Sequence, residues 1–267
     1  MQRIRASSLA ELHDCPARWA SKYIDGRTLP SSGKAALGTA VHASTAAYDQ
    51  SVIDGSGLSI DDAAAAAVDA IWHPKYDVDW GEDSPKKIEE VALSLHIRYC
   101  KEVAPNIQYA VVEETADDLI IEDLGLRLTG TIDRIYKDEV GQLGIADIKT
   151  GKVAVGEDGT VATAEHTYQL GAYELLAQHT TGRPIEAPAK IIGMSTTNAK
   201  PKTEKPKRIG IGEITGAREV LLGTEEEPGI LFYAAKIIHS GLFYGNPKSM
   251  MCHKKYCPNF GSCRFRK

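Results

Sequence analysis

The hydrophobic pattern of this 267-residue chain changes its period twice, and this change restricts the fold more than any other feature. Apolar residues follow helical spacing through most of the N-terminal third, and helical spacing returns after residue 163. Over 109–150 the pattern becomes short segments of branched apolar residues, separated by turn signals. We therefore predict a meander of antiparallel strands there, inside one α/β domain with a helical N-terminal part.

Four helices are expected before the strands. Ser8, with a glutamate three residues later, has the spacing of a capping box and predicts a helix start. A second helix covers 33–50 and is rich in small residues. The third helix begins behind Ser59, and the fourth has Ser84 as its cap with Pro85 at its first position.

The part of the chain after the meander alternates between helices and strands. A helix is expected over 163–180, followed by strands over 190–196 and 208–213. A basic loop, 199–208, separates these two strands, and one long helix is expected over 215–240. Helices on both sides of a sheet are typical of an α/β protein.

Composition excludes several classes of protein. Hydrophobic residues make up 43% and charged residues 25%, which excludes a disordered chain, a collagen-like chain and a coiled coil. No run approaches the roughly 18 apolar residues of a membrane span, and the first residues lack the apolar core of a signal peptide. The expectation is a cytoplasmic protein with no membrane partner.

The distribution of charged residues along the chain is more informative about nucleic-acid binding than the net charge. The net charge is −5, which does not by itself indicate nucleic-acid binding. However, residues 241–267 contain lysines and arginines but no acidic residue, and 199–208 form a second basic stretch. Basic patches of this kind on an acidic chain can bind a polyanion.

The sharpest motif lies in two successive predicted strands, which carry Asp133 and Asp147. Lys149 shares a face with Asp147, because side chains two apart in a strand point the same way, and Ile148 turns toward the other layer. If the two strands pair, Asp133 reaches the same place. Such charges are costly in an apolar sheet unless they hold something, and Mg²⁺ or Mn²⁺ is the natural partner. Read alone, a D-x-K motif is more often a structural ion pair.

Two helical features add to this motif. His42 lies four residues after Gly38, and an imidazole is a competent metal ligand, although a lone helical histidine usually lies at the surface. Gln169 and Tyr173 are four residues apart and therefore share one face of a helix. This face either packs its tyrosine in the core or lines a cleft beside the metal.

Five cysteines, an odd number in a chain without an export signal, argue against a disulfide framework. Cys100 lies within a helical pattern and is expected to be a buried packing residue. Three others crowd near the end of the sequence: Cys252, Cys257 and Cys263. If the chain ends meet, Cys15 supplies a fourth thiolate and the set suits a [4Fe–4S] cluster. The alternative is a zinc site with His253 as fourth ligand.

In this order, the motifs resemble the RecB-like branch of the PD-(D/E)XK nucleases, and within it the members that carry an iron–sulfur cluster. These include the CRISPR-associated adaptation nuclease, subunits of helicase–nucleases and phage RecB-like exonucleases. The gap between the first two C-terminal cysteines is four residues, where the adaptation nuclease usually has two. The matching residues span nearly the whole chain: Gly38, His42, Gly130, Asp133, Asp147, Lys149, Thr150, Gly151, Gln169, Tyr173, Cys15, Cys252, Cys257 and Cys263.

The resemblance implies an α/β fold with a restriction-endonuclease-like core, in which helices flank a central mixed β-sheet. It also implies a helical N-terminal part and a C-terminal cysteine cluster. We expect residues 1–267 to form a single nuclease domain. Within it, 1–105 would be the helical part, 106–240 the catalytic core and 241–267 the cluster-binding tail.

The resemblance also implies roles for individual residues. Mg²⁺ or Mn²⁺ would be held by His42, Asp133, Asp147 and the main-chain carbonyl of Ile148. The catalytic residues would be Asp133, Asp147, Lys149, Gln169 and Tyr173, with Gln169 and Tyr173 positioning the DNA strand. A [4Fe–4S] cluster on Cys15, Cys252, Cys257 and Cys263 would pin the N-terminal helix to the tail.

The expected function is that of a metal-dependent deoxyribonuclease, an exonuclease acting on single-stranded DNA ends in recombination, repair or phage DNA processing. Because no G-x-x-x-x-G-K-[ST] motif occurs, a motor would have to come from a separate helicase or recombination partner. Relatives that form rings make a homo-oligomer an expected partner state. One alternative is a nucleic-acid-binding subunit of a CRISPR adaptation or helicase–nuclease complex, active only with partners. Another is a zinc-stabilised regulatory domain with a decayed site.

Overall fold

The computed structural model describes residues 1–196 and 209–266. The basic loop predicted over 199–208 lies outside these residues. None of the helices in the described ranges is long and apolar enough to cross a membrane.

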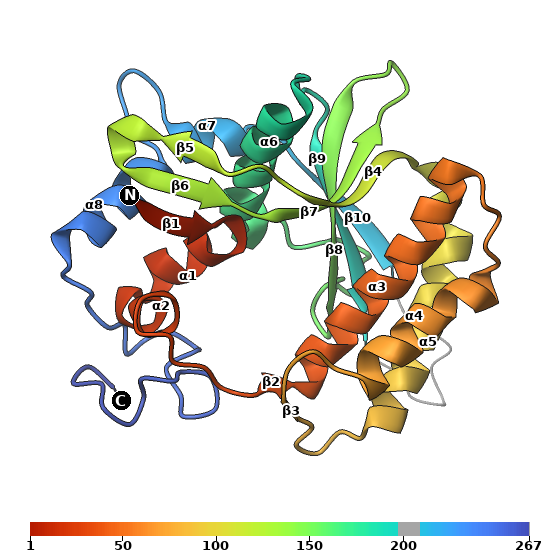
Figure 1. The fold of residues 1–267 in the computed structure, drawn as a ribbon, viewed down its shortest axis with the longest axis horizontal. Coiled ribbons are helices and arrows are strands. Elements are labelled where there is room, and N and C mark those ends of the chain that lie inside the picture. Colours follow the sequence, from red (N-terminus) through yellow and green to blue (C-terminus); the bar gives the residue numbers. More distant parts are fainter. Residues whose placement is uncertain (197–208, 267) are drawn as a thin grey trace.

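A five-stranded mixed sheet forms the centre of the molecule (Figure 1). Its order is β10-β9-β8-β7-β4, and only β8 and β9 run parallel. The parallel pair requires a crossover, which is made by helix α6 (Thr167–Thr181). The strands are β4 (Gln108–Thr115), β7 (Thr131–Lys137), β8 (Leu143–Gly151), β9 (Ala189–Ser195) and β10 (Ile209–Ile214).

A second, smaller sheet corrects the predicted meander. β5 (Leu119–Ile121) and β6 (Leu126–Thr129) do not extend the central sheet; β6 pairs with β5 on one side and with β1 (Gln2–Arg5) on the other. β4 pairs instead with β7. The chain passes from β6 into β7 at Gly130, where an added Cβ would lie 3.1 Å from both Leu176 and Tyr173 on α6. The switch between sheets therefore depends on a residue without a side chain.

The N-terminal third is helical, apart from β1 and two short strands, β2 (Ser31–Ser32) and β3 (Val78–Asp79). The predicted caps Ser59 and Ser84 are confirmed, since each hydroxyl accepts a hydrogen bond from a first-turn amide. The capping box at Ser8 is wrong, because its hydroxyl donates to the Arg5 carbonyl and accepts from the Trp19 indole. The helices are α1 (Leu9–Asp14), α2 (Pro16–Tyr23), α3 (Gly33–Asp54), α4 (Ile60–Trp72) and α5 (Pro85–Glu102).

The single helix predicted over 215–240 is also wrong. The chain forms α7 (Ala217–Leu222) and α8 (Ile230–Ser240), with a turn between them. Gly223 ends α7 with a φ of +83°, which favours glycine, and it bridges to Pro228, a residue that cannot continue a helix.

The two faces of the central sheet are covered by separate apolar layers (Figure 1). On one face, α3, α4 and α5 bury residues such as Val41 and Leu95 against Ile148. On the other face, α6 packs Leu170 and Leu176 against the sheet, together with the small sheet and α1, α2, α7 and α8. The sheet is thus the middle of three layers, and its polar residues are enclosed from both sides.

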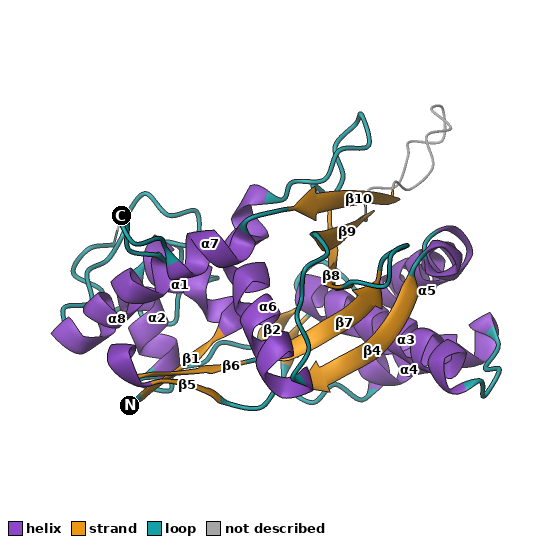
Figure 2. Cartoon of the chain, turned by 90° about the horizontal axis from the view of Figure 1, so that it is seen from above, coloured by secondary structure: helices purple, strands orange, loops and turns teal. Residues whose placement is uncertain are grey.

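The C-terminal tail lies beside α1 and α2 (Figure 2), which meets the condition under which Cys15 joins the three C-terminal cysteines. The amide of Ala17 donates to the carbonyl of Tyr244 over 2.9 Å, and the hydroxyl of Ser249 donates to the Asp14 carboxylate over 2.6 Å. Residues of the tail therefore pack on α1 and α2.

Two helix-interior glycines provide a matched test of this packing. An added Cβ at Gly171 would collide with the backbone of Ala217 on α7, whereas the nearest atom at Gly38 is the hydroxyl of Thr150 at 3.5 Å. We expect Gly171→Ala to destabilise the protein by about 1–3 kcal/mol, despite the better helix propensity of alanine. Gly38→Ala should leave the free energy of unfolding unchanged or raise it by about 1 kcal/mol. Urea unfolding of both variants measures the contrast, and equal effects would contradict it.

Candidate metal centre and catalytic site

Strand pairing brings the two predicted aspartates together. β7 and β8 are antiparallel with Arg134 opposite Ala146, and one further step in this register puts Asp133 opposite Asp147. The amide of Ile148 donates a hydrogen bond to the Asp133 carboxylate over 3.1 Å. Ile148 itself packs in the layer on the other face, as the alternation of the strand predicted.

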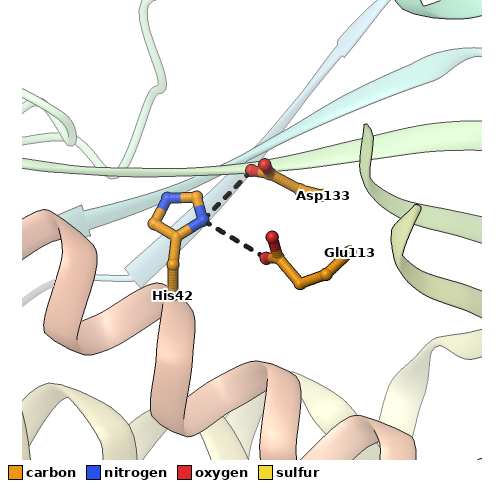
Figure 3. Close-up of side chains that lie close together, drawn as sticks. All are labelled: His42, Glu113 and Asp133. Carbon is orange, nitrogen blue, oxygen red and sulfur yellow. Dashed lines mark ion pairs between the residues drawn. The ribbon is translucent and has the colours of Figure 1, made fainter. Parts of the chain in front are cut away.

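Helix α3 supplies the imidazole of His42. Its Nε2 donates to the carbonyl of Ile148 over 2.8 Å, so this carbonyl faces the site. Its Nδ1 lies 3.4 Å from Asp133 Oδ2 and 3.9 Å from Glu113 Oε1 (Figure 3). Through His42, helix α3 thereby contacts all three strands that contribute to the site, β4, β7 and β8.

Glu113 is a site residue that sequence reasoning missed. It lies on β4, and among the described residues it is the only non-glycine residue with a positive φ, at 51°. Such a conformation costs free energy and is found most often at functional sites. The one signal in the sequence was a charged side chain inside an apolar strand segment. The strand alone did not reveal that Glu113 would turn toward His42.

These three side chains fit a divalent cation. The ligand atoms of His42, Glu113 and Asp133 all lie within 4.8 Å of one another, and no other such group occurs in the part of the chain that the structure describes. Opposed ligands around Mg²⁺ stand about 4.2 Å apart, since each lies about 2.1 Å from the ion. Asp147 was expected in this set but lies outside it at that spacing.

Asp147 is buried beside the group rather than within it. Its side chain is 1% exposed, and its Oδ2 lies 2.7 Å from the ammonium of Lys149. Its Oδ1 has no hydrogen-bond partner among the described residues, which is a costly state for a buried carboxylate. Burial, followed by the charge of Asp133, raises the pKa of Asp147 to about 6. A nearby cation would satisfy this oxygen.

The carboxylates around His42 favour the protonated form of its imidazole. Burial lowers the pKa of this imidazole, but Asp133, Glu113 and Asp147 outweigh it and raise the pKa to about 9. The site thus collects negative charge and stabilises a positive one in its middle.

Lys149 connects the aspartates with helix α6. Its ammonium donates to Gln169 Oε1 over 3.2 Å, and the Gln169 amide donates to the Tyr173 hydroxyl over 2.8 Å. The structure therefore brings Asp147, Lys149, Gln169 and Tyr173 into one chain of contacts. Burial, with help from Asp133, raises the pKa of the Tyr173 hydroxyl, so this group stays protonated.

The buried guanidinium of Arg134 forms hydrogen bonds with the elements that carry the site. It is fully buried and donates to Asp49 Oδ2 over 2.8 Å, to Glu113 Oε1 over 3.2 Å and to the Asp133 carbonyl over 2.7 Å. A fourth hydrogen bond, of 3.1 Å, reaches the Thr45 hydroxyl. Asp49 and Thr45 both lie on α3, the helix that carries His42. Arg134 thereby ties helix α3 to the two carboxylate-bearing strands.

The four cysteines of the expected cluster are free thiols that are not paired with one another, and all four line a single cavity. The cavity is small, about 10 Å³. Burial raises the pKa of the Cys257 thiol, and the neighbouring Cys15 and Cys263 raise it further. Thiolates around one zinc ion stand about 3.8 Å apart, because each Zn–S bond is about 2.3 Å. No set of three cysteine or histidine ligand atoms is that compact in the described ranges. Cys100 is buried on α5, as predicted.

The buried ion pair gives a test by double substitution. Arg134→Met leaves the Asp49 carboxylate buried without its cation, so we expect a loss of about 3–5 kcal/mol in the free energy of unfolding. Adding Asp49→Leu removes that charge and should recover most of the loss. Urea unfolding without divalent cations measures both variants.

The control is Lys87→Met, which removes a surface ion pair with Asp83 and should cost about 1 kcal/mol or less. Equal destabilisation by Arg134→Met and by the double variant would show that the uncompensated charge is not the cause.

Comparison with known proteins identifies the family to which the chain belongs. The family model of the PD-(D/E)XK nuclease superfamily matches residues 3–264. No curated protein matches the sequence. A solved structure titled "Crystal structure of SSO0001" is similar with a TM-score of 0.45 and 15% identity, covering 100% of this chain and 87% of that one. Because the family match spans nearly all of its residues, the chain belongs to the PD-(D/E)XK nuclease superfamily.

Proposed function

We propose that this protein hydrolyses DNA phosphodiesters at strand ends, as a metal-dependent exonuclease in recombination, repair or phage DNA processing. Membership of a nuclease superfamily implies a nucleic acid substrate. One observation carries the proposal. The ion pair of the buried Asp147 with the partly exposed Lys149 adjoins the cation-sized group of His42, Glu113 and Asp133.

The donor set fits a hard divalent cation such as Mg²⁺ or Mn²⁺, since it combines carboxylates with one imidazole. His42, Glu113 and Asp133 would hold it, with Asp147 and the Ile148 carbonyl on the adjoining side. When bound, such a cation polarises a phosphoryl oxygen and lowers the pKa of water.

The remaining chemistry belongs to side chains of this protein. Water attacks phosphorus, the bond to the 3′-oxygen breaks, and the departing oxygen takes up a proton. The Lys149 ammonium, held by Asp147 and Gln169, places a positive charge where negative charge develops on the phosphoryl group. Tyr173 supports Gln169 through its hydroxyl, so this pair positions the strand.

A second candidate function is that of a nucleic-acid-binding subunit that becomes active only with partners. It is favoured by apolar side chains that the tail leaves exposed. Met250 is 88% exposed and Leu242 is 77% exposed, and a partner that covers the tail would bury both side chains.

The thiol cavity supports a [4Fe–4S] cluster on Cys15, Cys252, Cys257 and Cys263 as the second cofactor. Four thiols around one cavity are the donor set of such a cluster. The small cavity requires residues of the tail to move outward when a cluster is held. The cluster would then covalently join α2 to the tail.

The nuclease proposal is tested with Mn²⁺ and end-labelled single-stranded DNA. We expect Asp133→Ala and Lys149→Ala to lose about 100-fold or more of the rate, because each removes a charge that acts in the transition state. Lys152→Ala is the matched control, since this lysine lies three residues beyond Lys149 and is exposed. Equal degradation by all variants would contradict the assignment. DNA binding without cleavage by the wild type would favour the partner-dependent candidate.

The cluster proposal is tested by anaerobic purification and iron analysis. The wild type should be brown and contain about four iron atoms per chain. Cys100→Ser should retain this iron, because Cys100 lies on α5 and does not line the cavity. Cys15→Ser should lose it. Full iron in Cys15→Ser would remove Cys15 from the ligand set, and zinc in the wild type would refute the cluster.

A further inference from the structure

A second pocket adjoins the catalytic site and shares Asp133 and Tyr173 with it, but the proposed function gives no role to its two arginines. We propose that this pocket binds the 5′-phosphate end of a DNA strand through Arg3 and Arg5, so that the enzyme requires a phosphorylated end. The inference rests on the proposed nuclease function and specifies its substrate.

The two arginines stand on the outer face of the small sheet. β1 alternates strictly, with Arg3 and Arg5 exposed and Ile4 buried between them, so both guanidinium groups leave the strand on one side. β1 pairs in parallel with β6, which places Arg5 beside Thr129 at the end of the strand. From there the chain continues through Gly130 into β7 and Asp133.

The pocket itself connects these arginines with the catalytic residues. Its volume is about 330 Å³, and its lining includes Arg3, Arg5, Ser7, Thr131, Asp133 and Tyr173. This volume lies at the lower end of the range for small-ligand sites, about 300–1,000 Å³, so the pocket accommodates a nucleotide unit rather than a duplex. Asp133 belongs both to this pocket and to the metal group. A nucleotide bound here therefore has its next phosphodiester close to the cation site.

The charges of the pocket match a phosphate. The guanidinium of Arg5 makes no hydrogen bond or ion pair with any described residue, and its main-chain carbonyl accepts a hydrogen bond from the Ser8 hydroxyl. Arg3 uses its Nε to donate to the Thr129 hydroxyl over 3.2 Å, which leaves its two terminal nitrogens available. The acid at the rim, Asp118, is already paired with Arg127 over 3.4 Å. Two unpaired guanidinium groups with adjacent hydroxyls suit the double charge of a terminal phosphate, whereas an internal phosphodiester carries one charge.

The chemistry of the cut selects the 5′ end. The water oxygen becomes bonded to phosphorus, the bond to the 3′-oxygen breaks, and that oxygen takes up a proton. The shortened strand then begins with a 5′-phosphate, which is the group that the pocket recognises. Removal of nucleotides from the 3′ end would instead leave a 3′-hydroxyl, and the arginines would lose their ligand after each cut.

The test compares single-stranded oligonucleotides that carry a 5′-phosphate, a 5′-hydroxyl or a 3′-phosphate, with full-length protein and Mn²⁺. We expect the wild type to degrade the 5′-phosphorylated strand about tenfold faster or more, the scale of one charge-assisted hydrogen bond. Arg3→Gln with Arg5→Gln should abolish this preference while cleavage of the 5′-hydroxyl strand continues. Arg183→Gln is the matched control, because this exposed arginine does not line the pocket, and it should retain the preference.

The outcomes separate this inference from the proposed function. Cleavage of all three substrates at equal rates, or a preference for the 3′-phosphate, would refute the 5′-phosphate site and leave the nuclease intact. A preference that survives the double arginine variant would also refute it. Absence of cleavage on every substrate would refute the proposed function itself.

Discussion

Two carboxylates facing each other across a pair of apolar strands are the constraint on which the rest of the site depends. The register of β7 and β8 places Asp133 opposite Asp147, and burial makes their repulsion strong. The protein surrounds them with positive or proton-donating groups from other elements. Lys149 approaches Asp147 from the same strand, and His42 approaches Asp133 from α3. A divalent cation would complete this balance and supply a partner for the buried Oδ1 of Asp147.

The buried Arg134 extends this pairing of positive and negative groups into the core. Arg134 follows Asp133 in the sequence, yet its side chain forms hydrogen bonds with Asp49 on helix α3 and with Glu113, the residue of positive φ on β4. The hydrogen bonds of the Arg134 guanidinium join β7 to helix α3 and to strand β4. Removing this side chain would therefore loosen the packing of the strands that carry the site. The positions of the site's charged groups therefore depend on the three-layer packing behind them, and the proposed chemistry requires such fixed charges.

The N-terminal strand and the C-terminal tail carry none of the metal ligands of the site. The N-terminal strand lies in the small sheet next to the catalytic edge, where it lines the arginine pocket, while α1 and α2 hold the C-terminal tail. The order β1-β6-β5 makes β6 the link between the N-terminus and β7.

The sequence by itself determined the elements whose signals are local. Ser59 and Ser84 cap their helices, the i, i+2 spacing puts Asp147 and Lys149 on one face, and the i, i+4 spacing joins Gln169 to Tyr173. Only the tertiary structure decided the rest. It moved β5 and β6 into a second sheet, paired β4 with β7 and turned Glu113 toward His42. Hydrophobic period predicts which segments become strands, but not which strands pair, because pairing depends on long-range contacts that share no local pattern. For the same reason Glu113, Arg134 and the arginines of β1 carried no recognisable motif until the fold brought them to one place.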